Sequence, residues 1–372
     1  MNADLVVVAE AWRGLPTAVH HLMTYVALDR QILWVDADVL RRNAAGSGTV
    51  APPLSGGCGE PAPFDVISQL PPLPRAGHLA CVADGQHAVR LVAATARRVG
   101  IRRPVLWLAA AEGRRLTGLM NEQGVVYHQL ADALPDTVDA AALAADADLI
   151  VTGSPAAAAV FPAERARVLA DGVSPELFAT PMQPAPTLPL DRAVAGFHGR
   201  IDASFDAALL DAVARRLPHW RFLLIGPLAK DAPPLPQLSN VTVLGPRPHA
   251  ELPRFSQYWT ASMLLRRGAV GDRLPQQLRE YVAAGAPIVG HCDGLPQALR
   301  PTVWGADGAD DFVAGLQAAL REPREFRARR RRALDGDVWP ARAAEVAAML
   351  DALVPAAEPW AQGRSEARRV SI

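Results

Sequence analysis

A glycine-containing turn near the middle of the chain is a candidate phosphate site. Residues 196–200 read Gly-Phe-His-Gly-Arg and end a short apolar strand pattern. Glycine lets the backbone approach a ligand closely, and the helix expected to begin near Ser204 or Phe205 would offer N–H groups and the positive end of its dipole. Since ligands of parallel α/β sheets bind beyond the carboxyl ends of the strands, we expect a ligand here. The alternative is an ordinary strand-to-helix connection.

The segments around this turn predict two α/β units. Short apolar strand patterns alternate with helix patterns over residues 5–152, and the alternation restarts over residues 193–290. Short Val/Ile/Leu-rich strands separated by helices indicate a parallel sheet covered on both faces. The predicted organisation is an N-terminal unit (1–178), a proline-rich linker (179–190), a second unit (191–335) and a helical tail (336–372).

Composition restricts the class of protein. The 372 residues are 50% hydrophobic and 20% charged, which indicates a soluble globular chain of two domains. The formal net charge of zero gives no support to nucleic-acid binding. The three cysteines are scattered and there is no HxxxH pattern, so neither a disulfide framework nor a metal site is expected. The N-terminus has no cationic region before its first apolar run, which favours a cytoplasmic protein.

Several short motifs follow one another in a fixed order along the chain. Those of the first half are Glu10-Ala11-Trp12-Arg13, His20-His21-Leu22, Val126-Tyr127 with Asp132 beyond it, Asp148-Leu149-Ile150-Val151-Thr152, and Asp171-Gly172-Val173. Those of the second half are Gly199 to Asp206, Leu224 to Pro227, Asn240 to Pro248, and Glu280-Tyr281 with Ala284-Gly285. In this order they resemble GT-B glycosyltransferases, more narrowly the bacterial exopolysaccharide transferases that include the xanthan glucuronosyltransferase.

The resemblance implies two Rossmann-like α/β domains facing each other across a cleft, with a C-terminal helix that crosses back to the first domain. The second domain would hold a UDP- or GDP-linked sugar and the first a saccharide or lipid-linked acceptor. The implied reaction is hexosyl or glucuronosyl transfer in polysaccharide or glycoconjugate synthesis, with no metal ion and no cofactor besides the nucleotide-sugar substrate. The implied location is cytoplasmic, with association with the inner membrane as a further hypothesis.

The resemblance also suggests catalytic residues in the first domain. Asp132 follows a short strand and would take the proton of the acceptor hydroxyl as general base. His20 and His21 would contact the acceptor or stabilise charge at the mouth of the cleft. The alternatives are that Asp132 starts a turn or helix, and that the two histidines are an ordinary surface pair.

The donor side departs from the family pattern at Gln277, and the aspartate usual in the strand before its helix is also missing, since that segment reads Tyr258-Trp259-Thr260-Ala261. Gly199 and Arg200 would meet the diphosphate, and Glu280 would accept a hydrogen bond from a ribose or sugar hydroxyl. Relatives tend to have a phosphate-facing lysine where this chain has Gln277, a neutral residue. Since Lys230 is the only lysine, we expect arginines to replace that charge, the candidates being Arg200, Arg266, Arg267, Arg273 and Arg279.

Two other functions and two readings of an arginine-rich segment remain open. A catalytically degenerate GT-B protein would act as a binding subunit of a polysaccharide synthesis complex, and a UDP-sugar epimerase would share the double-Rossmann arrangement. The seven arginines between residues 321 and 332 are either a solvated helix face or an attachment to anionic lipid headgroups.

Overall fold

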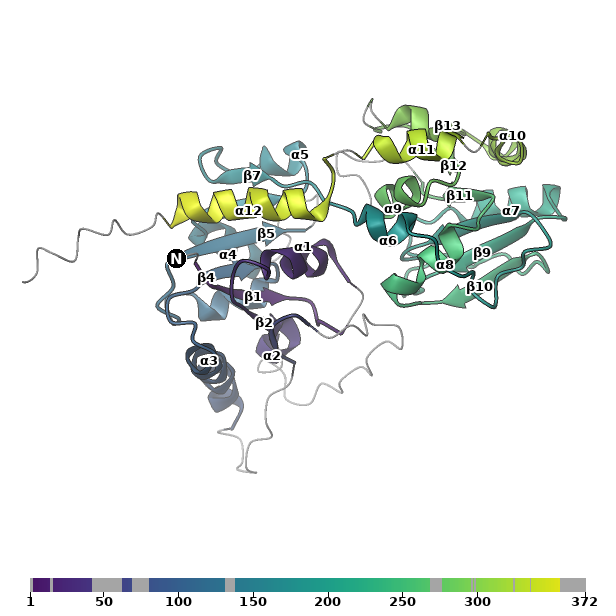
Figure 1. The fold of residues 1–372 in the computed structure, drawn as a ribbon. Helices are drawn as coiled ribbons and strands as arrows, with labels where there is room; N and C mark the ends of the chain where they lie inside the picture. Colours follow the sequence, from purple (N-terminus) through teal and green to yellow (C-terminus); the bar gives the residue numbers. More distant parts are fainter. Residues whose placement is uncertain are drawn as a thin grey trace, which may run out of the picture.

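The computed structural model has two α/β lobes side by side (Figure 1). It describes residues 3–13, 16–41, 62–68, 80–130, 138–267, 276–295, 297, 299–323, 325–334 and 336–354. Within these ranges no helix is both long and apolar enough to cross a membrane.

The first lobe is built on a parallel sheet of seven strands in the order β3-β2-β1-β4-β5-β6-β7. Alternate residues of β1 enter cores on opposite faces, Val6 and Val8 on one and Leu5 and Val7 on the other, which is why its sequence is continuously apolar. The elements are β1 (Leu5–Ala9), α1 (Ala18–Val26), β2 (Ile32–Asp36), α2 (Ala37–Arg41), β3 (Asp65–Ile67), α3 (Ala80–Arg98), β4 (Val105–Leu108), η1 (Ala111–Leu116), β5 (Gly124–Gln129), α4 (Val138–Asp146), β6 (Leu149–Thr152), α5 (Pro155–Ala158) and β7 (Ala166–Val168).

The second lobe has a parallel sheet of six strands in the order β10-β9-β8-β11-β12-β13. Because the strands are parallel, the residues that follow β8 and β11 lie at the same edge of the sheet. The elements are α6 (Pro175–Ala179), β8 (Val194–His198), α7 (Ala207–Arg216), β9 (Arg221–Ile225), β10 (Val241–Gly245), η2 (His249–Glu251), α8 (Pro253–Ser256), β11 (Ala261–Leu264), α9 (Gln276–Ala284), β12 (Ile288–Gly290), η3 (Arg300–Thr302), β13 (Val303–Gly305), α10 (Ala309–Ala319) and α11 (Glu325–Arg332). The last helix, α12 (Trp339–Leu353), packs on the core of the first lobe.

The chain crosses between the lobes twice, and the two crossings pair with each other. The backbone N–H of Val173 donates to the carbonyl of Asp337, and the N–H of Trp339 donates back to the carbonyl of Val173. Helix α12 then lies along the first lobe (Figure 1), where Asp351 forms a 2.7 Å ion pair with the buried Arg30 of the α1–β2 turn. The predicted return of the C-terminal helix to the first domain is therefore confirmed.

The structure corrects three sequence-based expectations. The edge strands β7 and β13 were not predicted, since three-residue strands carry little periodicity, and helix α10 was not predicted either. The helix after the glycine turn begins at Ala207, later than expected. Within the arginine run, Arg330 is 6% exposed, so neither a solvated face nor a lipid contact describes it.

Arg330 and its neighbour instead bind the end of another helix. Arg331 donates to the carbonyls of Ala283 and Ala284 at 2.9 and 3.0 Å, and Arg330 donates to that of Gly285 at 2.6 Å. These carbonyls have no partner within α9, and positive charge at a helix C-terminus is favourable. The two arginines therefore stabilise the helix that carries Glu280.

Candidate functional site

The Glu280 carboxylate of α9 is in contact with three polar side chains of the second lobe, those of His249, Gln276 and His198. Its Oε1 accepts hydrogen bonds from Nε2 of His249 at 2.8 Å and from the amide of Gln276 at 3.2 Å. Nδ1 of His198 lies 3.6 Å from Oε2. Glu280 is only 4% exposed, so its charge is compensated by side chains and not by bulk water.

The electrostatics of this group follow from burial and from the bond to His249. Burial raises the pKa of Glu280, but the charge of His249 and its hydrogen bond, with smaller effects from His198 and His21, lower it to about 2. Burial lowers the pKa of His198 to about 4, although Glu280 acts in the opposite direction. The carboxylate is therefore ionised near pH 7, and the 2.8 Å bond from His249 is its main stabilising contact.

The segment predicted to bind phosphate, residues 196–200, comprises the end of β8 and the turn that follows it, and we call it the donor turn. It lies next to the first turn of α9. Gly199 has a φ of +134°, and a Cβ there would lie 3.4 Å from the side-chain amide of Gln277. The Tyr281 hydroxyl accepts from the N–H of His198 at 2.9 Å and so fixes the strand end. Gly199 and the α9 residues Gln277 and Glu280 are thus brought together as predicted.

Gln277 does not present its amide to a ligand in this structure. Its Nε2 donates both to the carbonyl of His198 and to the hydroxyl of Tyr281 at 2.7 Å. An amide nitrogen has two hydrogens, so both are used within the fold. The residue at the position of the family lysine therefore stabilises the donor turn.

The start of α7 is not the open helix end that we expected. Asp206 is its N-cap and accepts from the N–H of Leu209 at 3.0 Å, which places a carboxylate where a phosphate was predicted. Nε of Arg267 lies 3.7 Å from the same carboxylate. Because this carboxylate already binds one N–H group and brings negative charge, the first turn of α9, beside Gly199, is the better placed helix start for a phosphate.

Three of the predicted arginines lie on the exposed side of the donor turn. Arg200, Arg266 and Arg267 are all exposed, and Arg266 pairs through its backbone with Phe205. Burial opposes the lowering of the pKa of Asp202, but hydrogen bonds from Ser204 and the charges of Arg266 and Arg200 lower it overall. These guanidinium groups therefore gather near the donor turn. A hollow of about 280 Å³ beside the first turn of α7 reaches this group at Arg267.

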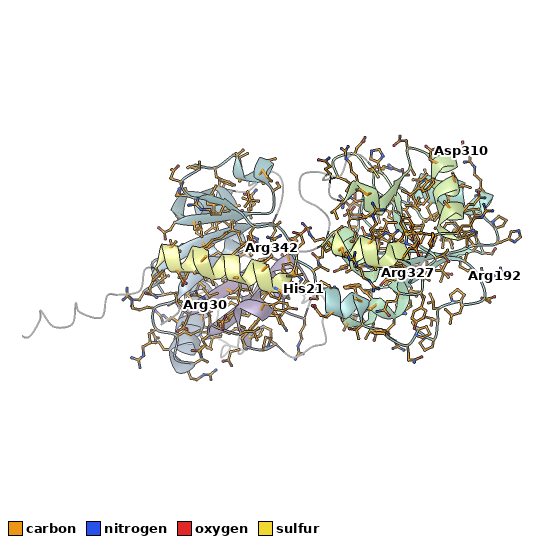
Figure 2. All side chains as sticks on the ribbon, turned by 45° about the horizontal axis from the view of Figure 1, so that its top comes forward. His21, Arg30, Arg192, Asp310, Arg327 and Arg342 are labelled. Carbon is orange, nitrogen blue, oxygen red and sulfur yellow. The ribbon has the colours of Figure 1, made fainter. Side chains whose placement is uncertain are left out.

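The two histidines of the first lobe have different environments. Nδ1 of His20 accepts from the N–H of Thr17 at 3.1 Å, and its Nε2 lies 3.2 Å from the carbonyl of Ala11. Burial lowers the pKa of His20 to about 4, so it is neutral and holds the β1–α1 loop. His21 instead faces the second lobe (Figure 2), where its ring centroid is 4.5 Å from that of His249.

Asp36 is a buried polar residue of the first lobe whose role the sequence analysis did not predict. It ends β2, and its Oδ1 accepts from the N–H of Trp12 at 2.9 Å and from the indole of Trp34 at 3.0 Å. Burial raises its pKa to about 6, although these hydrogen bonds act in the opposite direction. Its position after an apolar strand was the available signal. Asp36 fixes the loop that contains Trp12.

Two predicted site residues, Asp132 and Arg273, lie outside the described residues. Gln129, the last residue of β5, is the described strand end that precedes Asp132 in the sequence. Among the residues that the structure describes, no group of three or more His, Cys, Asp or Glu side chains could hold a metal ion.

Comparison with known proteins supports the sequence-based family assignment. Residues 200–348 match a family model described as Glycosyl transferase-like. Over 171 residues the chain is 28% identical to a Bacillus subtilis (strain 168) protein named for teichuronic acid biosynthesis, the glycosyltransferase TuaH. That match covers 42% of this chain and 43% of TuaH, so it spans less than half of either protein.

Solved structures share the fold over nearly the whole chain. Sucrose-phosphate synthase from Thermosynechococcus elongatus is 16% identical with a TM-score of 0.64, and Anabaena HepE in complex with UDP and glucose is 14% identical with a TM-score of 0.66. Each comparison covers 94% of this chain and 99% of the other. The predicted two-domain GT-B fold and the resemblance to GT-B glycosyltransferases are confirmed.

Proposed function

We propose that this chain, which has the GT-B fold, is a glycosyltransferase that moves a sugar from a nucleotide-linked donor to a saccharide acceptor. The observation that carries the proposal is the ionised Glu280 carboxylate beside the donor turn. Ribose and sugar hydroxyls are hydrogen-bond donors that suit such an acceptor. Nδ1 of His198 lies 3.6 Å from Oε2, beyond hydrogen-bond distance, so this oxygen can accept a hydrogen bond from a ligand. The family match over residues 200–348 supports the same assignment.

The leaving diphosphate needs positive charge. As the acceptor oxygen bonds to the anomeric carbon, the bond from that carbon to the diphosphate oxygen breaks and the electron pair stays with the diphosphate. We assign its stabilisation to Arg200, Arg266 and Arg267 together with the N–H groups of the first turn of α9. This assignment requires no metal ion, so transfer should be unaffected by EDTA.

Asp132 is the proposed general base, and a base on the acceptor side favours inversion at the anomeric carbon. The substitution Asp132→Asn should leave donor binding unchanged and lower the transfer rate about 10²- to 10⁴-fold, because the acceptor hydroxyl would keep its proton. Single-turnover transfer from a radiolabelled donor measures this rate. Near-normal turnover would remove Asp132 from the mechanism.

The proposed donor is a UDP-linked hexose or glucuronic acid, with a GDP-linked sugar as the alternative nucleotide. UDP and glucose are the ligands named for the structure of HepE, which shares the fold. Calorimetric titration with UDP, GDP and their sugars tests the proposal directly. Saturable binding of one nucleotide is expected, and absence of binding by both would contradict it.

A lipid-linked acceptor would bring the enzyme to an anionic membrane surface. The part of the arginine run that remains exposed supports this: Arg321, Arg329 and Arg332 are exposed, and Phe326 is 40% exposed with Arg329 over its ring at 6.0 Å. Each basic residue close to such a surface contributes about 1 kcal/mol. Flotation with anionic and with neutral liposomes separates membrane attachment from a solvated helix face.

A further inference from the structure

We propose that His21 of the first lobe is a positioning residue for the donor site of the second lobe, because it holds the His249 ring that binds Glu280. The assignment of Glu280 to the donor rests on the proposed function. The positioning of His249 by His21 rests on the contacts alone.

His249 lies on a short element and is packed between rings of both lobes. It begins η2, a turn of three residues with no side-chain cap. Two rings pack against its imidazole: Phe178 at 5.6 Å with an interplanar angle of 69°, and His21 at 4.5 Å with an angle of 52°. Both contacts restrict the orientation of the ring that donates to Glu280. One of the two comes from the other lobe.

His21 is itself fixed at the crossing between the lobes. Its ring stacks on Trp339 at 5.6 Å and 21°. Trp339 is 2% exposed and packs on Gly172, where a Cβ would lie 2.7 Å from the Trp339 nitrogen. The rings of Trp339, His21 and His249 therefore form a continuous row from the paired crossings to Glu280.

His21 acts in this row through packing and not through charge. Burial, with a smaller effect from His249, lowers the pKa of His21 to about 3, so its ring is neutral near pH 7. A neutral flat ring supports His249 without competing for Glu280. It follows that the hydrogen bond from His249 to Glu280 is held in place only when the first lobe packs against the second as in this structure. Nucleotide affinity at the second lobe therefore depends on a residue of the first lobe.

The first test needs no nucleotide. The Nε2–H proton of His249, hydrogen-bonded to a carboxylate, should give a downfield NMR resonance in the ligand-free protein, assigned by its loss in His249→Ala. We expect His21→Ala to broaden or remove this resonance and His21→Phe, which keeps a stacking ring, to retain it. His219→Ala, at an exposed histidine of the α7–β9 loop, is the matched control. A resonance unchanged in His21→Ala would overturn the inference.

The second test measures UDP affinity by calorimetry. His21→Ala and His249→Ala should each raise the Kd of UDP about tenfold, in line with the loss of one charge-assisted hydrogen bond, and the double variant should lose no more than His249→Ala alone. Additive losses, or an unchanged Kd in His21→Ala, would refute the role at the donor site. If the wild-type protein binds no UDP while the NMR result holds, the proposed function fails and the positioning of His249 stands.

Discussion

Replacing Glu280 by glutamine tests whether the charge of this buried carboxylate stabilises the fold. The substitution keeps the shape of the side chain and its oxygen acceptor, but it removes the negative charge. In the structure that charge is compensated by a 2.8 Å hydrogen bond from His249 inside the second lobe. Glu280→Gln should therefore act as a permanently protonated Glu280.

The size of the effect follows from the pKa of the carboxyl. Lowering that pKa from 4.5 to about 2 in the folded state corresponds to about 3 kcal/mol. Since the folded pKa is the lower one, this stabilisation is fully present above pH 4.5 and is lost as the pH falls through about 2. Glu280→Gln should be about 3 kcal/mol less stable than wild type at pH 7, and the difference should shrink as the pH approaches 2.

Guanidinium chloride unfolding followed by circular dichroism at pH 7, 5 and 3 measures this difference. Glu164→Gln, at an exposed glutamate, is the control and should change stability by no more than about 0.5 kcal/mol. Equal stability of Glu280→Gln and wild type at pH 7 would refute the reasoning. A loss that does not change with pH would show that packing, and not charge, was altered.

Three further predictions concern the donor turn and the elements that support it. Arg267→Ala should raise the Kd of UDP about tenfold. Gln277→Ala should raise it less, because the amide of Gln277 donates its hydrogen bonds to His198 and Tyr281. Equal effects of the two substitutions in calorimetry would contradict the assignment of the diphosphate to the arginines. Gly226 has a φ of +148°, and a Cβ there would lie 1.9 Å from the Gly199 carbonyl oxygen. Gly226→Ala should therefore lower the free energy of unfolding, measured by thermal unfolding, by about 1–3 kcal/mol, and it should weaken UDP binding because the donor turn must shift. Arg330→Met should cost about 3 kcal/mol, since it removes the donor to the carbonyls of Gly285 and Thr302 and the partner of Glu322. The exposed Arg329→Met on the same helix should be nearly neutral, and similar losses in both variants would refute the role of Arg330 beside the end of α9.

The sequence by itself determined the fold and the place of the donor turn. Runs such as Leu5–Ala9 and Val105–Leu108 are apolar at every position, and only a strand covered on both faces buries all of them. Alternation of such strands with helices leaves few topologies besides parallel sheets. The glycines at 196 and 199 marked a strand end, and the structure brings Gly199 against α9.

Only the tertiary structure decided which polar groups meet. Periodicity shows which face of a helix is buried, but it does not show that His249 and His198 reach Glu280, or that His21 comes from the other lobe. Burial is costly for an unpaired charge, so each buried carboxylate must find partners, and those partners come from distant segments brought together by packing. For the same reason Gln277, which the sequence presented as a weakened phosphate ligand, is a hydrogen-bond donor that holds the donor turn in place.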